Sequence, residues 1–172
     1  MKRIIIVGVS GSGKTYTAKK LGKLLNIHSY DLDEYYWNPN WQKKDRQEFT
    51  NTVTKIVSAE TWIVSGNFSS FDQAIWQRCD SVIWLDYSFF RCLAQSLKRS
   101  LKRIVYKIPC CNGNYETFSQ LFFSRNSIIL WVLRSYNKRR AFYSEIFNDL
   151  SNKKTLIRFQ SPKETNKWFK QL

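Results

Sequence analysis

The fold is decided by one stretch near the start, Arg3-Ile4-Ile5-Ile6-Val7-Gly8-Val9-Ser10-Gly11-Ser12-Gly13-Lys14-Thr15. From Gly8 onward it matches the pattern G-x-x-x-x-G-K-[ST] in full, after a β-branched apolar run and before a helical pattern. The glycines let the backbone curl so that successive N–H groups point inward, where they can bind phosphate oxygens. The positive end of the following helix adds to this attraction. The stretch therefore predicts a strand, a phosphate-binding loop and a helix, in that order.

The same loop predicts that the protein binds ATP together with Mg²⁺. Lys14 is placed to reach the β- and γ-phosphates, and the Thr15 hydroxyl is a candidate metal ligand. The alternative is a glycine-rich turn without a ligand, and the complete match in its strand–loop–helix context argues against it. The residues predicted to hold the nucleotide are Gly8, Ser10, Gly11, Ser12, Gly13, Lys14, Thr15 and Tyr16.

Length and composition are those of a single folded domain. The chain has 172 residues, of which 43% are hydrophobic and 16% aromatic, so a disordered or fibrous class is excluded. No stretch approaches the roughly 20 apolar residues that a membrane span needs. The apolar run Ile4–Val7 is also too short for a signal peptide. We therefore expect one domain over residues 1–172, located in the cytoplasm and without a membrane partner.

The cysteines agree with a reducing compartment. Cys79, Cys92, Cys110 and Cys111 form no C-x-x-C pair, and the single histidine, His28, is distant from all of them in the sequence. This spacing does not fit a zinc site. We expect reduced thiols with structural roles.

Positive charge is concentrated in the middle of the chain. The formal net charge is +15, and the segment from Tyr87 to Ser144 contains eleven Lys and Arg but one acid, Glu116, which leaves +10 there. Such a concentration implies an anionic partner, either the phosphates of a small substrate or those of a nucleic acid. The alternative is a solvated basic surface, which we prefer for the scattered lysines near the C-terminus.

Apolar runs alternate with amphipathic stretches along the whole chain, with no internal repeat and no low-complexity linker. Helices are predicted after capping boxes that begin at Asp45 and Ser161, over residues 15–25 and 88–106, and within residues 124–148. This alternation predicts an α/β fold with a parallel sheet covered on both faces, whose ligands bind beyond the carboxyl ends of the strands. The strands are predicted over residues 3–7, 27–30, 61–65, 81–85 and 155–159.

The strand at 81–85 separates two classes of phosphate-loop protein. Motor and remodelling ATPases usually place a glutamate beside the aspartate that serves their Mg²⁺, in order to activate water. Here the strand ends in Asp86 and Tyr87 follows, so Asp86 is a candidate metal neighbour without an adjacent base. A chain of this length also leaves no room for a second, force-transmitting domain. Both features favour phosphoryl transfer to a bound acceptor.

Two carboxylates follow the second predicted strand, at the ligand edge of the sheet. Asp31 and Asp33 project in a similar direction, since side chains alternate along a strand. One of them can hold Mg²⁺ through a water while the other orients or deprotonates an acceptor hydroxyl. The alternative is a helix cap plus a surface acid. The aromatic run Tyr35–Trp41 comes next, and it either stacks on a base or sugar or packs in the core.

These motifs together resemble the adenylate-kinase-like P-loop proteins often labelled DNA topology modulation proteins, within the wider nucleoside and nucleotide kinase group. The resemblance runs nearly end to end, and the phosphate loop is its most specific part. Its other parts are Leu32-Asp33 with Tyr36-Trp37-Asn38-Pro39-Asn40-Trp41, Trp62-Ile63-Val64-Ser65-Gly66-Asn67-Phe68, the strand Asp80-Ser81-Val82-Ile83-Trp84-Leu85-Asp86, and Trp131 with Arg139-Arg140.

The resemblance implies a three-layer fold with a five-stranded parallel sheet of order 2-3-1-4-5 and a helical lid around residues 107–125. Arginines on the two flanking helices would close over the transferred phosphoryl group, and guanidinium groups suit multidentate phosphate binding. The candidate arginines are Arg99, Arg103, Arg139 and Arg140, each with a solvated surface role as its alternative. The candidate acceptor contacts are Asp33, Trp37, Gly66 and Asn67.

Two positions depart from the pattern of that family. Ser65 stands where an aspartate commonly helps to hold Mg²⁺, so the metal must rely on Thr15, Asp31 or Asp86. Ser88-Phe89 replaces a Pro-Arg pair, which removes one basic contact. Either change would lower catalysis or alter the acceptor while nucleotide binding persists.

The sequence as a whole favours an ATP-dependent, Mg²⁺-requiring phosphotransferase. Its partners would be a nucleoside triphosphate and a small anionic or hydroxyl acceptor, such as a nucleoside or nucleotide. The first alternative is a nucleotide-gated nucleic-acid-binding protein that uses the basic segment at 87–144, although no nucleic-acid-binding motif is present. The second is a catalytically weak ATP-binding regulator, which the Ser65 departure keeps open.

Overall fold

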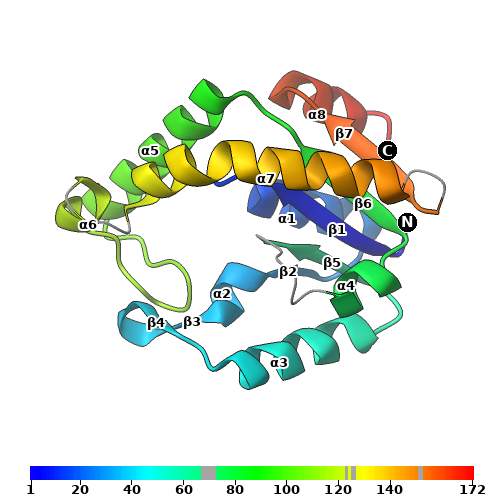
Figure 1. The fold of residues 1–172 in the computed structure, drawn as a ribbon, viewed down its shortest axis with the longest axis horizontal. Helices are drawn as coiled ribbons and strands as arrows, with labels where there is room; N and C mark the ends of the chain where they lie inside the picture. The colour runs from blue at the N-terminus through cyan, green and yellow to red at the C-terminus, as the bar shows by residue number, and fades with distance from the viewer. Residues whose placement is uncertain (67–72, 123, 125–126, 151–152) are drawn as a thin grey trace.

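The computed structural model describes residues 1–66, 73–122, 124, 127–150 and 153–172, and it has a central five-stranded parallel sheet between layers of helices (Figure 1). The strand order is β2-β5-β1-β6-β7, and each neighbouring pair is parallel. Counted in chain order, these five strands have the predicted order 2-3-1-4-5, so the predicted sheet is confirmed. The strands are β1 (Arg3–Gly8), β2 (Ser29–Asp31), β5 (Trp62–Ser65), β6 (Ser81–Leu85) and β7 (Thr155–Phe159).

Helices cover both faces of this sheet, and a small hairpin stands apart from it. The hairpin pairs β3 (Trp37–Asn38) with β4 (Gln42–Lys43) around the 3-10 turn η1 (Pro39–Trp41). The helices are α1 (Lys14–Leu25), α2 (Leu32–Tyr36), α3 (Arg46–Ser58), α4 (Gln73–Arg78), α5 (Phe89–Val105), α6 (Phe118–Phe122), α7 (Ile128–Leu150) and α8 (Pro162–Phe169).

The core lies on both faces of the sheet because successive residues of the inner strands are apolar and their side chains point alternately to the two faces. In β1, Ile4 and Ile6 pack with α1, α5 and α8 on one face, and Ile5 and Val7 pack with α3, α4 and α7 on the other. All four side chains are fully buried. A strand buried on both faces reads as a continuous apolar run, which is why β1 is recognisable from its sequence.

The predicted N-cap residues of two helices are confirmed by their hydrogen bonds. The Asp45 carboxylate accepts from the N–H groups of Gln47 and Glu48 at 2.8 and 3.1 Å and caps α3. The Ser161 hydroxyl accepts from the Glu164 N–H at 3.3 Å and caps α8. The start of β2 was predicted too early, because Ile27 donates its N–H to the Gly22 carbonyl at 2.9 Å and so completes the end of α1.

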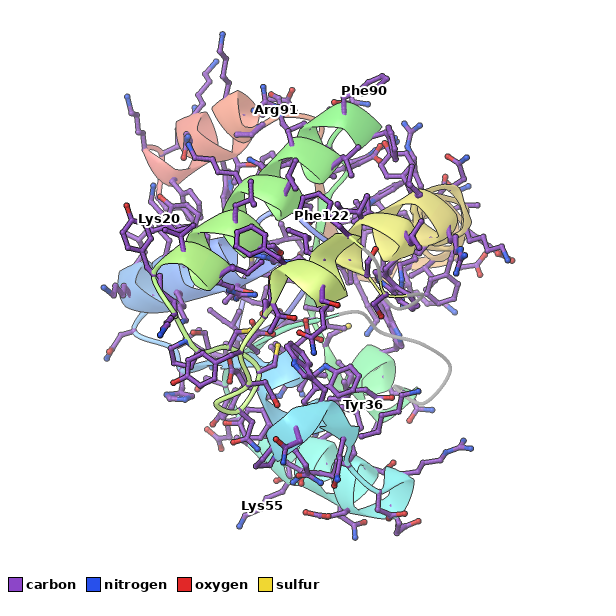
Figure 2. The ribbon with its side chains drawn as sticks, turned by 90° about the vertical axis from the view of Figure 1, so that its left-hand side faces the viewer. Lys20, Tyr36, Lys55, Phe90, Arg91 and Phe122 are labelled. Carbon is purple, nitrogen blue, oxygen red and sulfur yellow. The ribbon has the colours of Figure 1, made fainter. Side chains whose placement is uncertain are left out.

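Several short elements were not predicted, namely α2, α4, α6 and the β3–β4 hairpin. Each of these helices has at most six residues and each strand of the hairpin has two, so none is long enough for a periodic pattern. Figure 2 shows the side on which α6 packs between α5 and α7, with Phe122 between their ribbons and Phe90 and Arg91 at the far end of α5. The predicted helix within 124–148 is α7, which begins and ends later than expected.

Two negative findings apply to the described part of the chain. No helix there combines the length and the apolar character needed to cross a bilayer. No three His, Cys, Asp or Glu side chains among these residues gather closely enough to hold a metal ion. All four cysteines are free, in agreement with the prediction of reduced thiols.

The phosphate loop packs directly on the first turns of α5. Gly11 has a φ of 81°, and a Cβ there would collide with the backbone carbonyl of Cys92 and with the Ser96 hydroxyl. Gly13 has a similar φ of 91°, yet a Cβ there would meet no atom within 4 Å. An alanine at Gly13 would therefore lose stability only through backbone strain, whereas an alanine at Gly11 would also lose stability through steric overlap with α5.

We predict that Gly11→Ala destabilises the protein more than Gly13→Ala does. The left-handed backbone should cost each variant about 1–2 kcal/mol of unfolding free energy. Gly11→Ala should lose about 1–3 kcal/mol more, since its methyl group meets rigid backbone. Urea denaturation of both variants measures the difference, and equal losses would show that the loop is not held against α5.

Candidate functional site

The predicted site residues converge on the edge of the sheet where the parallel strands end. The phosphate loop follows β1, Asp31 ends β2, Gly66 follows β5 and Asp86 follows β6. Ligands of open α/β sheets bind at this edge, so the topology gives one place for chemistry. Asn67 lies outside the described residues.

Lys14 is folded back onto its own loop. Its ammonium group donates to the carbonyls of Gly8 and Val9 at 2.9 and 3.1 Å, and the residue is 8% exposed. Among the described residues, the buried Ser12 hydroxyl next to it has no hydrogen-bond partner. The loop thus presents a buried cation and an unsatisfied hydroxyl, a combination that suits an anionic oxygen ligand.

Burial lowers the pKa of Lys14 to about 8, because the charged form loses its hydration. The carboxylates of Asp33 and Asp31 oppose this shift, while Arg99 and Arg139 add to it. In the free protein, Lys14 therefore loses its charge as pH rises through about 8. A bound polyphosphate would restore the full charge.

One carboxylate links the phosphate loop to the next strand. Asp31 accepts a 2.5 Å hydrogen bond from the Thr15 hydroxyl with one oxygen and a 3.2 Å bond from the Asp33 N–H with the other. The second bond caps α2 and orients Asp33.

Thr15 and Asp31 also fit Mg²⁺ by the chemistry of their side chains. Their oxygens are 2.5 Å apart, and both are hard donors of the kind that this cation prefers. Mg²⁺ usually takes one or two protein oxygens and completes its shell with phosphates and waters. These two residues would hold it without a larger protein cage.

Asp33 is half-buried beside this pair, and its pKa is raised above the ordinary value. Loss of hydration is the main cause and the negative charge of Asp31 is the second, while Lys14, Arg99 and Arg139 act in the opposite direction. A carboxylate with a raised pKa is a stronger proton acceptor.

The four predicted arginines divide into two pairs. Arg99 and Arg139 interact electrostatically with both Lys14 and Asp33, so they belong to the same site. Arg103 instead donates to Glu116 at 2.7 Å, and Arg140 donates to Asp86 at 2.8 Å. The structure brings together two of the four and engages the other two in ion pairs.

Asp86 is the centre of a separate ion-pair cluster. Its side chain is 2% exposed, and its oxygens accept from Arg140 at 2.8 Å and from Arg158 at 2.5 Å. The Arg158 guanidinium also stacks on Trp84, 4.4 Å from the ring centre. These pairs engage both carboxylate oxygens, and the metal contact predicted for Asp86 stays a prediction.

The aromatic run after Asp33 mostly packs on itself. Trp37 meets Trp41 edge-on with ring centres 5.6 Å apart, and both side chains are half-buried. Tyr16, predicted beside the nucleotide, is 63% exposed at the loop side of α1. Gly66 lies against Leu32, where a Cβ would approach the Leu32 Cβ to 3.1 Å.

Several polar residues at this edge were missed by the sequence analysis. Glu34 joins the segment after α5 to α2, and Asn112 and Asn114 join it to the β3–β4 hairpin. Glu116 could have been recognised from the sequence, since it is the one acid within the basic segment at 87–144. Nothing in the sequence points to the two asparagines, because their hydrogen-bond partners are distant along the chain.

No family model and no curated protein sequence matches the chain. Its solved structural neighbours include shikimate kinase from Bacteroides thetaiotaomicron, with a TM-score of 0.59, 14% identity, and 99% of this chain and 95% of that chain covered. The chain has the fold of the shikimate kinases. The enzyme from Acinetobacter baumannii, in complex with shikimate, gives a TM-score of 0.57 at 16% identity, with 99% and 90% covered. The enzyme from Aquifex aeolicus gives 0.56 at 15%, with 98% and 92% covered.

The shikimate kinase fold belongs to the P-loop kinases of the adenylate-kinase-like group, so the broader part of the resemblance is confirmed at the level of fold. The narrower likeness to DNA topology modulation proteins stays a prediction, as does the cytoplasmic location.

We predict that ATP binding takes up a proton near pH 8. If the phosphates raise the Lys14 pKa from about 8 toward its ordinary 10.5, uptake at pH 8 should be about half a proton. ATP affinity should then fall as pH rises above about 8. Calorimetry in two buffers of different ionisation enthalpy measures the uptake.

Lys14→Arg is the matched control, because its guanidinium stays charged at these pH values. The variant should bind ATP without proton uptake. Equal uptake by both proteins would assign the titrating group elsewhere.

Proposed function

We propose that the protein is a small P-loop kinase that transfers the γ-phosphate of ATP to a hydroxyl group of a small acceptor. The observation that carries the proposal is the unbroken chain Lys14, Thr15, Asp31 and Asp33, which joins a phosphate-binding loop to a half-buried carboxylate. The shikimate kinase fold supports it.

The donor side would be held by the loop and α1. Lys14 would leave the carbonyls of Gly8 and Val9 and bind phosphate oxygens, and the backbone amides of residues 9 to 15 would complete the cradle. Thr15 and Asp31 would hold Mg²⁺, which supplies charge neutralisation for the phosphates.

The acceptor side would depend on Asp33. Its carboxylate would accept the proton of the acceptor hydroxyl while that oxygen bonds to the γ-phosphorus and the bond to ADP breaks. Arg99 and Arg139 would stabilise the negative charge on the transferring group, since both interact electrostatically with Lys14 and Asp33. The raised pKa of Asp33 supports the role of base.

The acceptor is proposed as a small hydroxyl compound, with nucleosides and nucleotides as one class to be tested. One structural neighbour was solved in complex with shikimate, which supports a compact hydroxylated acceptor. Stacking on a base by Trp37 or Trp41 has less support, because these rings already pack against each other.

The direct test is ADP production from Mg-ATP in a screen of nucleosides, nucleoside monophosphates and small hydroxylated acids. We expect an acceptor-dependent rate that Lys14→Ala abolishes, because the phosphates lose their buried cation. A flat screen with ATP binding intact would contradict the proposal and favour the nucleic-acid-binding or regulatory alternatives.

Asp33→Asn should separate chemistry from binding. Loss of the proton acceptor is expected to lower kcat by about 10²–10⁴-fold, while the Kd for ATP changes little. In the unmodified enzyme, kcat/KM should fall as pH falls through the raised pKa of Asp33. Equal losses in kcat and in ATP affinity would assign Asp33 a structural role.

A further inference from the structure

The segment between α5 and α6 comes down onto the acceptor side of the site. In Figure 1 this loop passes beside α2 and the β3–β4 hairpin before it returns to α6. Cys110 and Asn114 exchange backbone hydrogen bonds of 2.8 Å and close a tight turn at its tip. We call residues 110–115 the acceptor strap.

Glu34 holds the acceptor strap through main-chain contacts. Its two carboxylate oxygens accept from the N–H groups of Cys111 and Asn112 at 3.2 and 2.7 Å. Both residues have positive φ values, 48° and 63°, so their successive N–H groups form a concave anion site. Glu34 supplies the anion.

Four further hydrogen bonds fasten the acceptor strap to the hairpin. Asn112 donates to the Trp37 carbonyl at 3.0 Å, and Asn114 donates to the Asn38 carbonyl at 2.9 Å. Trp41 donates its N–H to the Asn114 side chain at 2.8 Å and its indole N–H to the Tyr115 carbonyl at 3.1 Å. The carbonyl and indole groups of the aromatic run thus serve as anchors for the strap.

The opposite side of the acceptor strap faces the basic helix α5. Arg103 pairs with Glu116 at 2.7 Å just beyond the strap, and the Cys110 thiol lies 3.8 Å from the same Glu116 oxygen. The strap therefore spans from α5 to α2, the helix in which Asp33 directly precedes Glu34.

We propose that Glu34 is a positioning residue that holds the acceptor strap over Asp33, so that the site admits small acceptors and excludes water. This inference rests on the proposed kinase function. Glu34 directly follows Asp33 in α2, and the Asp31 cap fixes the other end of that helix. Asp33 itself is half-buried.

Glu34→Ala tests the inference through the thiols of the strap, independently of activity. Without the carboxylate, the two N–H groups lose a charged acceptor, and we expect N-ethylmaleimide to modify Cys111 about tenfold faster. Peptide mass spectrometry reads the rate at each cysteine, and the buried Cys79 and Cys92 report general unfolding.

Two variants accompany that measurement. Glu48→Ala is the matched control, because Glu48 is exposed on α3 and bonds to Lys44, away from the strap. Its labelling rate should equal that of the unmodified protein. Glu34→Gln keeps the size and one good acceptor, so it should give an intermediate rate even if Glu34→Ala folds poorly. Unchanged labelling of Cys111 in Glu34→Gln and Glu34→Ala would overturn the inference.

The catalytic consequence is measured by two comparisons, ATP hydrolysis against phosphoryl transfer and KM for the acceptor against kcat. In Glu34→Ala we expect ATP hydrolysis without acceptor to rise relative to transfer, and KM for the acceptor to rise more than kcat falls. Faster labelling with both quantities unchanged would overturn the role in acceptor selection. If the unmodified protein phosphorylates no acceptor, the proposed function fails, whereas the labelling result still decides whether Glu34 holds the strap.

Discussion

The arrangement of the site depends on the carboxylate of Asp31. One of its oxygens accepts a hydrogen bond from the Thr15 hydroxyl of the phosphate loop. The other accepts a hydrogen bond from the Asp33 N–H and caps α2. A single side chain therefore fixes the spacing between the loop that would bind the donor and the helix that carries Asp33 and Glu34. Because α2 has only five residues, it has little stability of its own and requires this cap. The hairpin and the acceptor strap then build on α2, so their positions also follow from Asp31.

The positive charge of the middle segment serves more than one purpose. Arg99 and Arg139 act on Lys14 and Asp33, where they increase the attraction for an anionic ligand. Arg103 and Arg140 pair with Glu116 and Asp86 and join α5 and α7 to their neighbours. The Asp86 carboxylate is buried between Arg140 and Arg158, so its removal would leave two arginines without their counter-charge. Part of what appears in the sequence as a binding surface is thus internal structure.

The sequence predicted the parallel sheet, the long helices and the place of the site, because each has a local signature, whereas the strand order followed from the family resemblance. The phosphate loop is a contiguous motif, and the strands of the inner sheet are continuous apolar runs. Asp31 and Asp33 were also recognisable, since they follow a strand directly. The roles of Asp86 and Arg103 were not, because their partners lie 54 and 13 residues away along the chain. Glu34 was passed over for the same reason, as its contacts are 77 and 78 residues distant.

Local chemistry is enough to specify a phosphate loop on a parallel α/β sheet, because backbone conformation, helix dipole and strand burial act over a few residues. It does not specify which arginines reach the phosphates or what covers the acceptor. Those outcomes depend on which groups lie close together in the folded chain. An ion pair, or a turn that packs on a hairpin, stabilises the protein only when folding brings its two parts into contact. In this protein, tertiary contacts assigned Arg99 and Arg139 to the site, Arg103 and Arg140 to ion pairs, and Glu34 to the strap beside Asp33.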